Sequence, residues 1–315
     1  MRLIYSIPVL CHVLKVSRSG YYAYVKRPLS KHAIEDKRLE LEIKAAHKRT
    51  YGTYGSERLQ KHLLSCGIKA GICRIRRLRK MLGIRCKQVK KYKVTTDSNH
   101  TLPVADNLIN QNFAVSTPNQ VWTSDITYIP TEEGWLYLAT HKDLFNGEII
   151  GYATGSRIIK ELIMQSLLMA MRRRQPQKGV IHHSDRGSQY CSNVYGNMLS
   201  TFCMIPSMSR KGNCYDNAPM ESFFGTLKNE LVYQKKYNTR SEAIKDITEY
   251  IEIFYNRERI QAKLGYLSPA NYMKQYYKMR CAAELGLTVN WGKRYYVLGA
   301  WAVFILVVSV VFGTR

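Results

Sequence analysis

One stretch of the chain, from His183 to Lys228, decides how the rest of the sequence is interpreted. It begins with the motif His183-Ser184-Asp185-Arg186-Gly187-Ser188-Gln189-Tyr190. After 35 intervening residues from Asp185 comes Glu221, within Asn217-Ala218-Pro219-Met220-Glu221-Ser222-Phe223-Phe224. A third acid, Asp125, lies upstream in Trp122-Thr123-Ser124-Asp125-Ile126-Thr127-Tyr128-Ile129. Singly, each carboxylate reads as an ordinary surface acid, so their meaning depends on whether the fold brings them together.

The hydrophobic pattern around these acids predicts a mixed sheet flanked by helices. Three β-rich segments separated by short turns indicate an antiparallel meander over 121–129, 135–140 and 148–154. The segments after them alternate in type: a helix over 160–174, a strand over 179–183, a helix over 192–200, a strand over 204–208, and helices over 218–231 and 241–256. This order is that of a ribonuclease-H-like fold, in the α/β (α+β) class. Trp122 and Trp135 are expected in the core of the sheet.

The predicted elements place the acids favourably for metal chemistry. Asp125 falls inside the first strand and Asp185 at the end of the fourth, so both emerge near one sheet edge if those strands are neighbours. Asn217, Glu221, Phe224 and Lys228 are spaced 4, 3 and 4, which puts them on one helix face. Three carboxylates from separate elements suit a hard cation such as Mg²⁺. Two such ions serve phosphodiester cleavage and transfer.

The charge of the chain favours a polyanionic partner. The formal net charge is +25, and residues 1–117 hold 24 Lys/Arg against 7 Asp/Glu. Nucleic acid is the first expectation and an anionic membrane surface the second. A merely soluble basic surface would need far less charge.

The N-terminal third is predicted to be all-α. A helix over 9–24 ends near 17–20, a second follows a cap at or next to Ser30, and two more end at Gly67 and Gly83. Short helices joined by glycine-containing turns, the last one basic, favour a helix-turn-helix-like DNA-binding domain. The alternative is a solvated helix face. The candidate phosphate contacts on that last helix are Arg74, Arg76, Arg77, Arg79 and Lys80.

The domain boundaries follow composition. Residues 1–94 form the basic helical DNA-binding region, 95–117 a linker, and 118–278 the catalytic core. Residues 279–315 form an atypical tail with an uncharged apolar segment over 295–312. That segment is a marginal membrane span by length, but translation past the usual end of such a chain is the favoured explanation. The eight cysteines stand singly, without zinc-ligand spacing, and indicate reduced thiols in a cytoplasmic protein. Association with the nucleoid is the expected location of such a DNA-binding chain.

The three acid-containing segments resemble the D, D-35-E signature of the integrase-like transposases of bacterial insertion sequences. More narrowly, they resemble the catalytic chain encoded by the second reading frame (OrfB type) of the group most similar to retroviral integrases. The resemblance covers roughly residues 10–278 and extends to the segments 17–22, 54–63, 250–257 and 264–269. Gln261 departs from the pattern, since relatives often have His there.

The resemblance implies a polynucleotidyl transferase that cleaves at the ends of its mobile element and joins the 3′-hydroxyl ends to a target strand. Asp125, Asp185 and Glu221 would be the catalytic metal ligands for two Mg²⁺ ions, with Mn²⁺ as a substitute, and Lys228 would contact DNA. A homo-multimer and an upstream-frame helix-turn-helix/leucine-zipper partner or fusion are implied as well. Two alternatives stay open: a catalytically inactive DNA-binding remnant, and a metal-dependent nuclease of the same fold.

Overall fold

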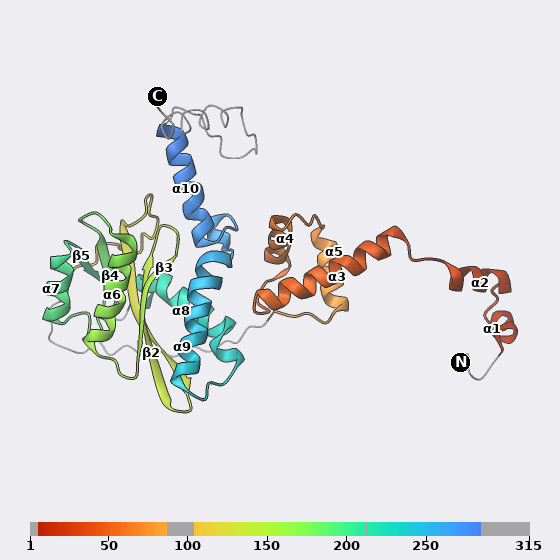
Figure 1. The fold of residues 1–315 in the computed structure, drawn as a ribbon, viewed down its shortest axis with the longest axis horizontal. Coiled ribbons are helices and arrows are strands. Elements are labelled where there is room, and N and C mark those ends of the chain that lie inside the picture. The colour runs from red at the N-terminus through yellow and green to blue at the C-terminus, as the bar shows by residue number, and fades with distance from the viewer. Residues whose placement is uncertain (1–5, 87–103, 212, 285–315) are drawn as a thin grey trace, which may run out of the picture. The chain divides into compact units, whose positions relative to one another are not determined.

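The computed structural model describes residues 6–86, 104–211 and 213–284, in two compact units, Met1–Cys86 and Lys87–Arg315 (Figure 1). The last part of the predicted DNA-binding region, 87–94, and the apolar segment 295–312 lie outside the described residues. Within the described ranges, no helix is long and apolar enough to cross a membrane.

Five helices make up the described part of the N-terminal unit: α1 Ile7–Val13, α2 Arg18–Lys26, α3 Lys31–Arg49, α4 Ser56–Ser65 and α5 Ile72–Met81. The prediction of one helix over 9–24 is wrong, because Ser17 caps a new helix by accepting a hydrogen bond from the Gly20 backbone N–H at 3.0 Å. Ser30 caps α3 as expected, since its Oγ accepts from the Ala33 N–H at 3.2 Å.

Helices α3, α4 and α5 pack together around aliphatic side chains. Ile43, Ile75 and Leu78 are fully buried, and Leu59 and Leu63 are nearly so. Ile34 and Leu41 on α3 are exposed at 56% and 68%. Leu39, Ile43 and Ala46 define the buried stripe instead, spaced 4 and 3 residues apart as a helix requires.

The second unit is built on a five-stranded mixed sheet in the order β3-β2-β1-β4-β5. The strands are β1 Val121–Thr131, β2 Gly134–Asp143, β3 Ile149–Gly155, β4 Ile181–Ser184 and β5 Ile205–Met208. Strands β1, β2 and β3 form the predicted antiparallel meander. Strand β4 pairs parallel to β1 and to β5, so the first and fourth strands are neighbours.

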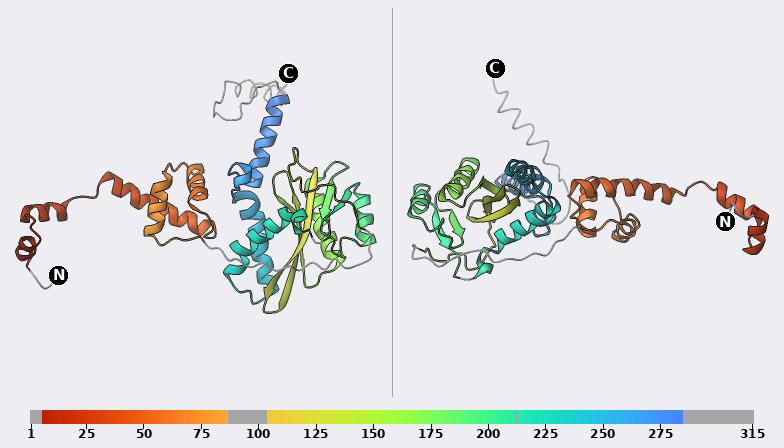
Figure 2. Two further views of the ribbon diagram at one scale, coloured as in Figure 1. Left: turned by 180° about the vertical axis from the view of Figure 1, so that it is seen from behind. Right: turned by 90° about the horizontal axis from the view of Figure 1, so that it is seen from below.

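Helices cover both faces of the sheet. Figure 2 shows α6 Lys160–Arg174 and α7 Asn193–Thr201 on one side of the strands. The other side carries α8 Ala218–Glu230, α9 Arg240–Glu249, a π-helix over Tyr250–Glu258 and α10 Pro269–Glu284. The order of elements is the predicted one, and the architecture is a ribonuclease-H-like mixed sheet with flanking helices. The helix expected over 241–256 changes to π-helical winding at Tyr250.

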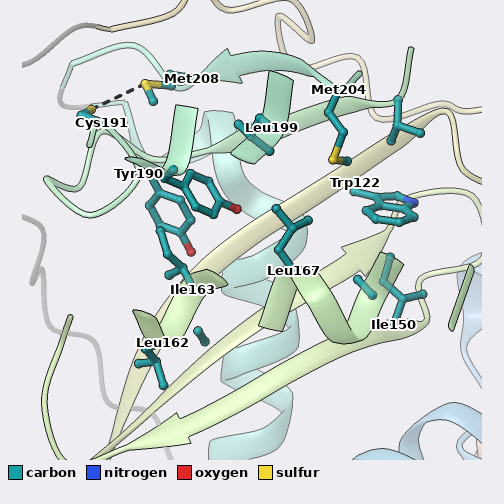
Figure 3. Close-up of a cluster of buried hydrophobic side chains, with 14 residues drawn as sticks. Trp122, Ile150, Leu162, Ile163, Leu167, Tyr190, Cys191, Leu199, Met204 and Met208 are labelled. Carbon is teal, nitrogen blue, oxygen red and sulfur yellow. Dashed lines mark hydrogen bonds between the residues drawn. The ribbon is translucent and has the colours of Figure 1, made fainter. Parts of the chain in front are cut away.

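The core between the sheet and α6 is apolar and closely packed (Figure 3). Trp122 and Leu167 are fully buried in it. Strand β3 approaches α6 so closely that a Cβ on Gly151 would lie 2.2 Å from the Ser166 carbonyl oxygen, so only glycine fits. Trp135 is not part of this core, contrary to expectation: it is 48% exposed near the turn of the β1–β2 hairpin.

Part of the expected linker packs against the sheet unit. The Leu108 N–H donates to Ser207 Oγ at 2.9 Å, and the Met208 N–H donates to the Asp106 carbonyl at 3.3 Å. Ile109 is buried. Residues 104–117 are therefore attached to the core.

Candidate active site

The first two acids lie where the pairing of β1 with β4 ends, a place that we call the β1–β4 crevice. In the described structure the two strands pair only over Val121–Thr123, opposite Ile181–His183. Asp125 lies two residues past the last pair on β1, and Asp185 follows the end of β4. The expected juxtaposition of Asp125 and Asp185 thus results from parallel pairing of the first and fourth strands.

The Asp125 carboxyl is set in a partly buried position close to other negative charges. Its Oδ1 accepts a hydrogen bond from the Ile126 N–H at 2.7 Å. Burial raises the pKa of Asp125 well above its usual range, and the charges of Asp185 and then Glu221 raise it further, while Lys228 opposes the shift. Acids in such an arrangement attract a cation.

The loop after β4 orients Asp185. Its Oδ1 accepts from the Gly187 N–H at 3.0 Å, and a Cβ on Gly187 would stand only 3.1 Å from that oxygen. The Arg186 Nε donates to the Ser209 carbonyl at 2.7 Å, which ties this loop to the end of β5. The motif 183–190 therefore continues from β4 into an ordered loop, and Arg186 anchors this loop to the end of β5.

Helix α8 is anchored beside the crevice at its N-terminal end. The Asn217 Nδ2 donates to the Ser124 carbonyl at 3.3 Å, which occupies the edge of β1 where β4 has separated. The Lys142 Nζ, buried under the helix, donates to the Pro219 carbonyl at 2.8 Å. Burial lowers the pKa of Lys142 well below its usual range. Sequence reasoning missed Lys142, because a lysine within a strand pattern gives no sign of a partner 77 residues away.

Glu221 and Lys228 lie on the accessible part of α8, whereas Asn217 and Phe224 on the predicted face are buried. Partial desolvation raises the pKa of the Glu221 carboxyl, although the residue as a whole is exposed. Burial lowers the pKa of the Lys228 ammonium and the charge of Asp125 raises it, so the ammonium lies within electrostatic reach of that acid. The face therefore presents one carboxylate and one ammonium toward the crevice.

The donor set fits a hard divalent cation in kind. All three candidate ligands are carboxylates, and Mg²⁺ uses one or two of them while keeping waters or taking phosphate oxygens. Across the described residues, no group of three or more Asp, Glu, His or Cys side chains is close enough together to hold a metal ion. The three carboxylates are therefore not drawn together in this arrangement: Asp125 and Asp185 come from neighbouring strands, and Glu221 is exposed on α8.

A cluster of hydrogen-bonded side chains around Asp216, which we call the strap, precedes α8 and was not predicted from the sequence. The buried Asp216 carboxylate accepts from Arg210 Nη2, Asn107 Nδ2 and Gln111 Nε2, each at 2.9 Å. The hydrogen bonds from Arg210 are the largest of the effects that hold the pKa of Asp216 well below its usual range. Asp216 lies five residues before Glu221. Its hydrogen bonds with Asn107 and Gln111 therefore attach the chain just before α8 to the segment that follows the N-terminal unit.

The histidines near the crevice, His182 and His183, are structural. The His182 Nε2 lies 3.1 Å from His141 Nε2 and 2.9 Å from Tyr195 Oη, and His183 Nδ1 lies 2.9 Å from Ser207 Oγ. Burial lowers the pKa of His182 to about 3 and that of His183 to about 4. Both rings stay neutral and bridge elements of the sheet unit.

The basic residues of α5 fall into three kinds of environment. The Arg74 Nε donates to Asp36 Oδ1 at 2.6 Å, and the Arg77 Nη2 donates to Asp36 Oδ2 at 2.5 Å. Arg79 is 8% exposed and donates to Ser56 Oγ at 2.9 Å. Arg76 and Lys80 are exposed. Of the arginine run at the end of α6, Arg173 pairs with Glu252 and Arg174 with Glu148.

Comparison with known proteins agrees with this geometry. Two models described as "Integrase core domain" match residues 115–214 and 221–277, and an "HTH-like domain" model matches residues 33–92. The chain is 55% identical over 270 residues to the "Insertion element IS600 uncharacterized 31 kDa protein" of Shigella sonnei, which covers 86% of this chain and 99% of that protein. It is 42% identical over 250 residues to the transposase for insertion sequence element IS904 of Lactococcus lactis, covering 79% and 98%.

A third relative is the transposase InsF for insertion sequence IS3A of Escherichia coli, 38% identical over 85% of this chain and 94% of that protein. Among solved structures, the HTLV-2 integrase catalytic core domain in complex with magnesium matches with a TM-score of 0.40 and 14% identity, over 50% of this chain and 99% of that one. The sequence relationships are decisive for the family. The chain belongs to the integrase-core transposases of bacterial insertion sequences, the retroviral-integrase-like group of polynucleotidyl transferases.

Proposed function

We propose that this transposase cleaves at the ends of its mobile element and joins the freed 3′-hydroxyl ends to a target strand at the β1–β4 crevice. The observation that carries the proposal is that Asp125 and Asp185 lie near each other where β1 and β4 stop pairing, with the charges of Glu221 and Lys228 on α8 acting on Asp125. Asp125 comes from β1, Asp185 from the loop after β4, and Glu221 from the first turn of α8. Hydrogen bonds from Asn217 and Lys142 hold that turn against the crevice.

Asp125, Asp185 and Glu221 would hold two Mg²⁺ ions, with Mn²⁺ as a substitute. When bound, such ions activate the attacking oxygen and stabilise the leaving one in phosphodiester transfer. Lys228 neutralises a DNA phosphate next to the acids and so offsets their repulsion toward the polyanion. Burial around Asp125 lowers the local dielectric, which strengthens each of these interactions.

The N-terminal unit supplies sequence-tolerant affinity for DNA. Arg76 and Lys80, exposed on α5, contact phosphates directly. Arg74 and Arg77 reach the same backbone when a phosphate competes with Asp36 for their guanidinium groups. Arg79 supports the packing of α5 on α4. The strength of such contacts falls as salt concentration rises, because binding releases counterions from the DNA.

The functional form is a homo-multimer that pairs two element ends, acting with or fused to an upstream-frame helix-turn-helix/leucine-zipper product. Joining two DNA ends to one target requires two crevices, and a monomer provides one. The separate N-terminal and core units suit an assembly in which DNA bound by one unit is processed elsewhere.

Glu221→Gln tests the proposed function with a duplex that carries the inverted-repeat end of the element and Mg²⁺. Nicking and joining are expected to fall at least about a hundredfold, since the loss of one metal ligand removes several kcal/mol of transition-state stabilisation. Glu161→Gln is the matched control, because Glu161 is also an exposed acid in the first turn of a helix, α6. It is expected to stay within about twofold of the wild type.

Two results would redirect the assignment. A fully active Glu221→Gln protein would show that α8 does not carry a catalytic ligand. Cutting by the wild type without any joined product would favour a nuclease of the same fold.

A further inference from the structure

The β1–β2 hairpin carries an aromatic pair next to the acid crevice. Tyr128 pairs with Tyr137 in the register, and Pro130 pairs with Trp135, so Tyr128 and Trp135 are diagonal neighbours on one face. Their ring centroids lie 4.9 Å apart at an interplanar angle of 84°. Figure 1 shows the hairpin extending beyond the other strands of the sheet.

Trp135 is exposed, and the backbone that carries it is held by hydrogen bonds. Its side chain is 48% exposed. The backbone around it is fixed by Arg240, whose Nε donates to the Trp135 carbonyl at 3.1 Å and whose Nη2 donates to the Glu133 carbonyl at 2.6 Å. The Arg240 N–H in turn donates to Glu133 Oε2 at 2.8 Å. A large aromatic ring held in solvent by an ordered backbone is pre-organised to receive a flat ligand.

Lys228 connects this aromatic pair to the acid crevice. Its Nζ lies 4.6 Å from the centre of the Tyr128 ring, within cation–π range. The same ammonium interacts electrostatically with the Asp125 carboxylate. Tyr128 is three residues from Asp125 along β1, roughly 10 Å, and residues three apart leave opposite faces of a strand, so Lys228 is the link between the ring and the acid. A separation of about 10 Å corresponds to about two or three nucleotides of one DNA strand.

We propose that Trp135, Tyr128 and Lys228 form a stacking site for an unpaired base of the element end, about two or three nucleotides from the phosphodiester that is processed. This inference rests on the proposed function. A base inside a duplex already has stacking partners on both faces, so the ring offered by Trp135 favours a base that has left its pair. Lys228 selects a polyanion, because it holds the phosphate that belongs to such a base. The site would thus stabilise local opening of the DNA end.

Photo-crosslinking tests the location of the base. Full-length Glu221→Gln protein, which leaves the DNA uncut, is irradiated with element-end duplexes that carry 5-iododeoxyuridine at one position from one to six nucleotides from the processed phosphate. Crosslinks to Trp135 or Tyr128, identified by mass spectrometry, are expected to peak at about the second or third nucleotide and to increase severalfold when that pair is mismatched. The proposal would be overturned if no position of the label gave crosslinks to the hairpin.

Kinetics with the active chain test the consequence. Trp135→Ala is expected to slow nicking of a fully paired end roughly tenfold, in line with the loss of one base–aromatic stack, and a mismatched end should recover most of the rate. Trp135→Phe should keep most of the activity. Tyr277→Ala is the matched control, because Tyr277 on α10 is also 48% exposed and lies outside the hairpin.

The outcomes separate this inference from the proposed function. If the wild type joins ends and Trp135→Ala matches it on both paired and mismatched ends, only the stacking site is overturned. If Trp135→Ala changes the mass of the assembly in light scattering, the ring serves a second protein chain, and the proposal is overturned in favour of that partner. A wild type that processes no end would instead refute the proposed function, while crosslinking still reports on the stacking site.

Discussion

The N-terminal helical unit and the sheet unit both depend on charged side chains, but they place them in opposite environments. In the helical unit, Asp36 pairs with Arg74 and Arg77 at the surface of α3 and α5. In the sheet unit, the buried Glu230 carboxylate accepts hydrogen bonds from Arg259 and Tyr250, and Lys142 is buried beneath α8. The Asp36 cluster is thus in contact with solvent, whereas Glu230, Arg259 and Lys142 are buried packing elements of the sheet unit.

This difference separates two tasks: affinity for DNA and the positioning of the catalytic site. Surface arginines can exchange an acidic partner for a phosphate at small cost, which suits a unit that binds DNA of any sequence. Buried charges have no such freedom, because removing one partner leaves the other without compensation in a low-dielectric interior. They hold α8 and the crevice in one arrangement, as a catalytic site requires.

The largest effect on stability is expected from breaking the buried ion pair. The Arg259 Nε and Nη2 donate to Glu230 at 2.8 and 2.7 Å. Arg259→Met should lower the free energy of unfolding by about 3–5 kcal/mol, because Glu230 stays buried without its partner. Urea unfolding followed by tryptophan fluorescence measures this. All four tryptophans lie outside residues 1–86, so the signal excludes the helical unit.

The double variant Glu230→Met with Arg259→Met is the control for this prediction. It should recover much of the loss, since two apolar side chains replace the pair without leaving a charge behind. A loss below about 1 kcal/mol for Arg259→Met alone would show that the pair behaves like a surface salt bridge and would remove the contrast between the units.

A smaller effect is expected from acid titration of the buried histidines. Burial lowers the pKa of His182 to about 3, below its unfolded value of about 6.5. The stability from the neutral ring is therefore complete above about pH 6.5 and is lost as pH falls toward 3, at about 1.4 kcal/mol for each pH unit. In urea unfolding between pH 6 and 4, His182→Gln should reduce the slope of the free energy of unfolding against pH by about 1.4 kcal/mol for each pH unit. Equal slopes for wild type and His182→Gln would contradict the account of a buried neutral histidine.

The smallest effect on stability is expected at Asp36. Hydrogen bonds from Arg77 and Arg74 lower the pKa of Asp36, yet the cluster is in contact with solvent and screened by salt. Asp36→Asn should barely change helix melting followed by circular dichroism. It should strengthen DNA binding and steepen its salt dependence by about 1 for each arginine released. Weaker binding by this variant would show that Asp36 orients the arginines for DNA.

The sequence predicted the elements whose signals are local. The order of strands and helices along the chain, the helix over 160–174 and the Ser30 cap follow from periodicity and turn residues. The meeting of Asp125 with Asp185 was expected only if the first and fourth strands were neighbours, a condition that the parallel pairing meets. The exposed Trp135 was assigned to the core because β-rich patterns do not reveal where a hairpin extends beyond the other strands of its sheet. A helix end was expected near 17–20, but the start of a second helix at Arg18 was missed, because a serine in a helical pattern looks the same whether it caps a helix or continues one.

The rest depends on contacts between distant residues. Nothing near Asp216 indicates that Asn107 and Gln111 will bond to it, and nothing near Lys142 indicates the Pro219 carbonyl as its acceptor. The division of the α5 arginines into paired, buried and exposed also depends on α3 and α4, which their own helix pattern does not show. Such partners become visible only when the chain is folded.

The central claim is that the carboxylates in the β1–β4 crevice act by holding metal ions, and Asp185→Cys tests it most directly. A thiolate is a poor ligand for Mg²⁺ and is better tolerated by the softer Mn²⁺. Joining of an element-end duplex is expected to fall at least about a hundredfold in Mg²⁺ and to return in part when Mn²⁺ replaces it, as measured by single-turnover assays. An Asp185→Cys protein that joins ends as fast as the wild type in Mg²⁺ would contradict the account.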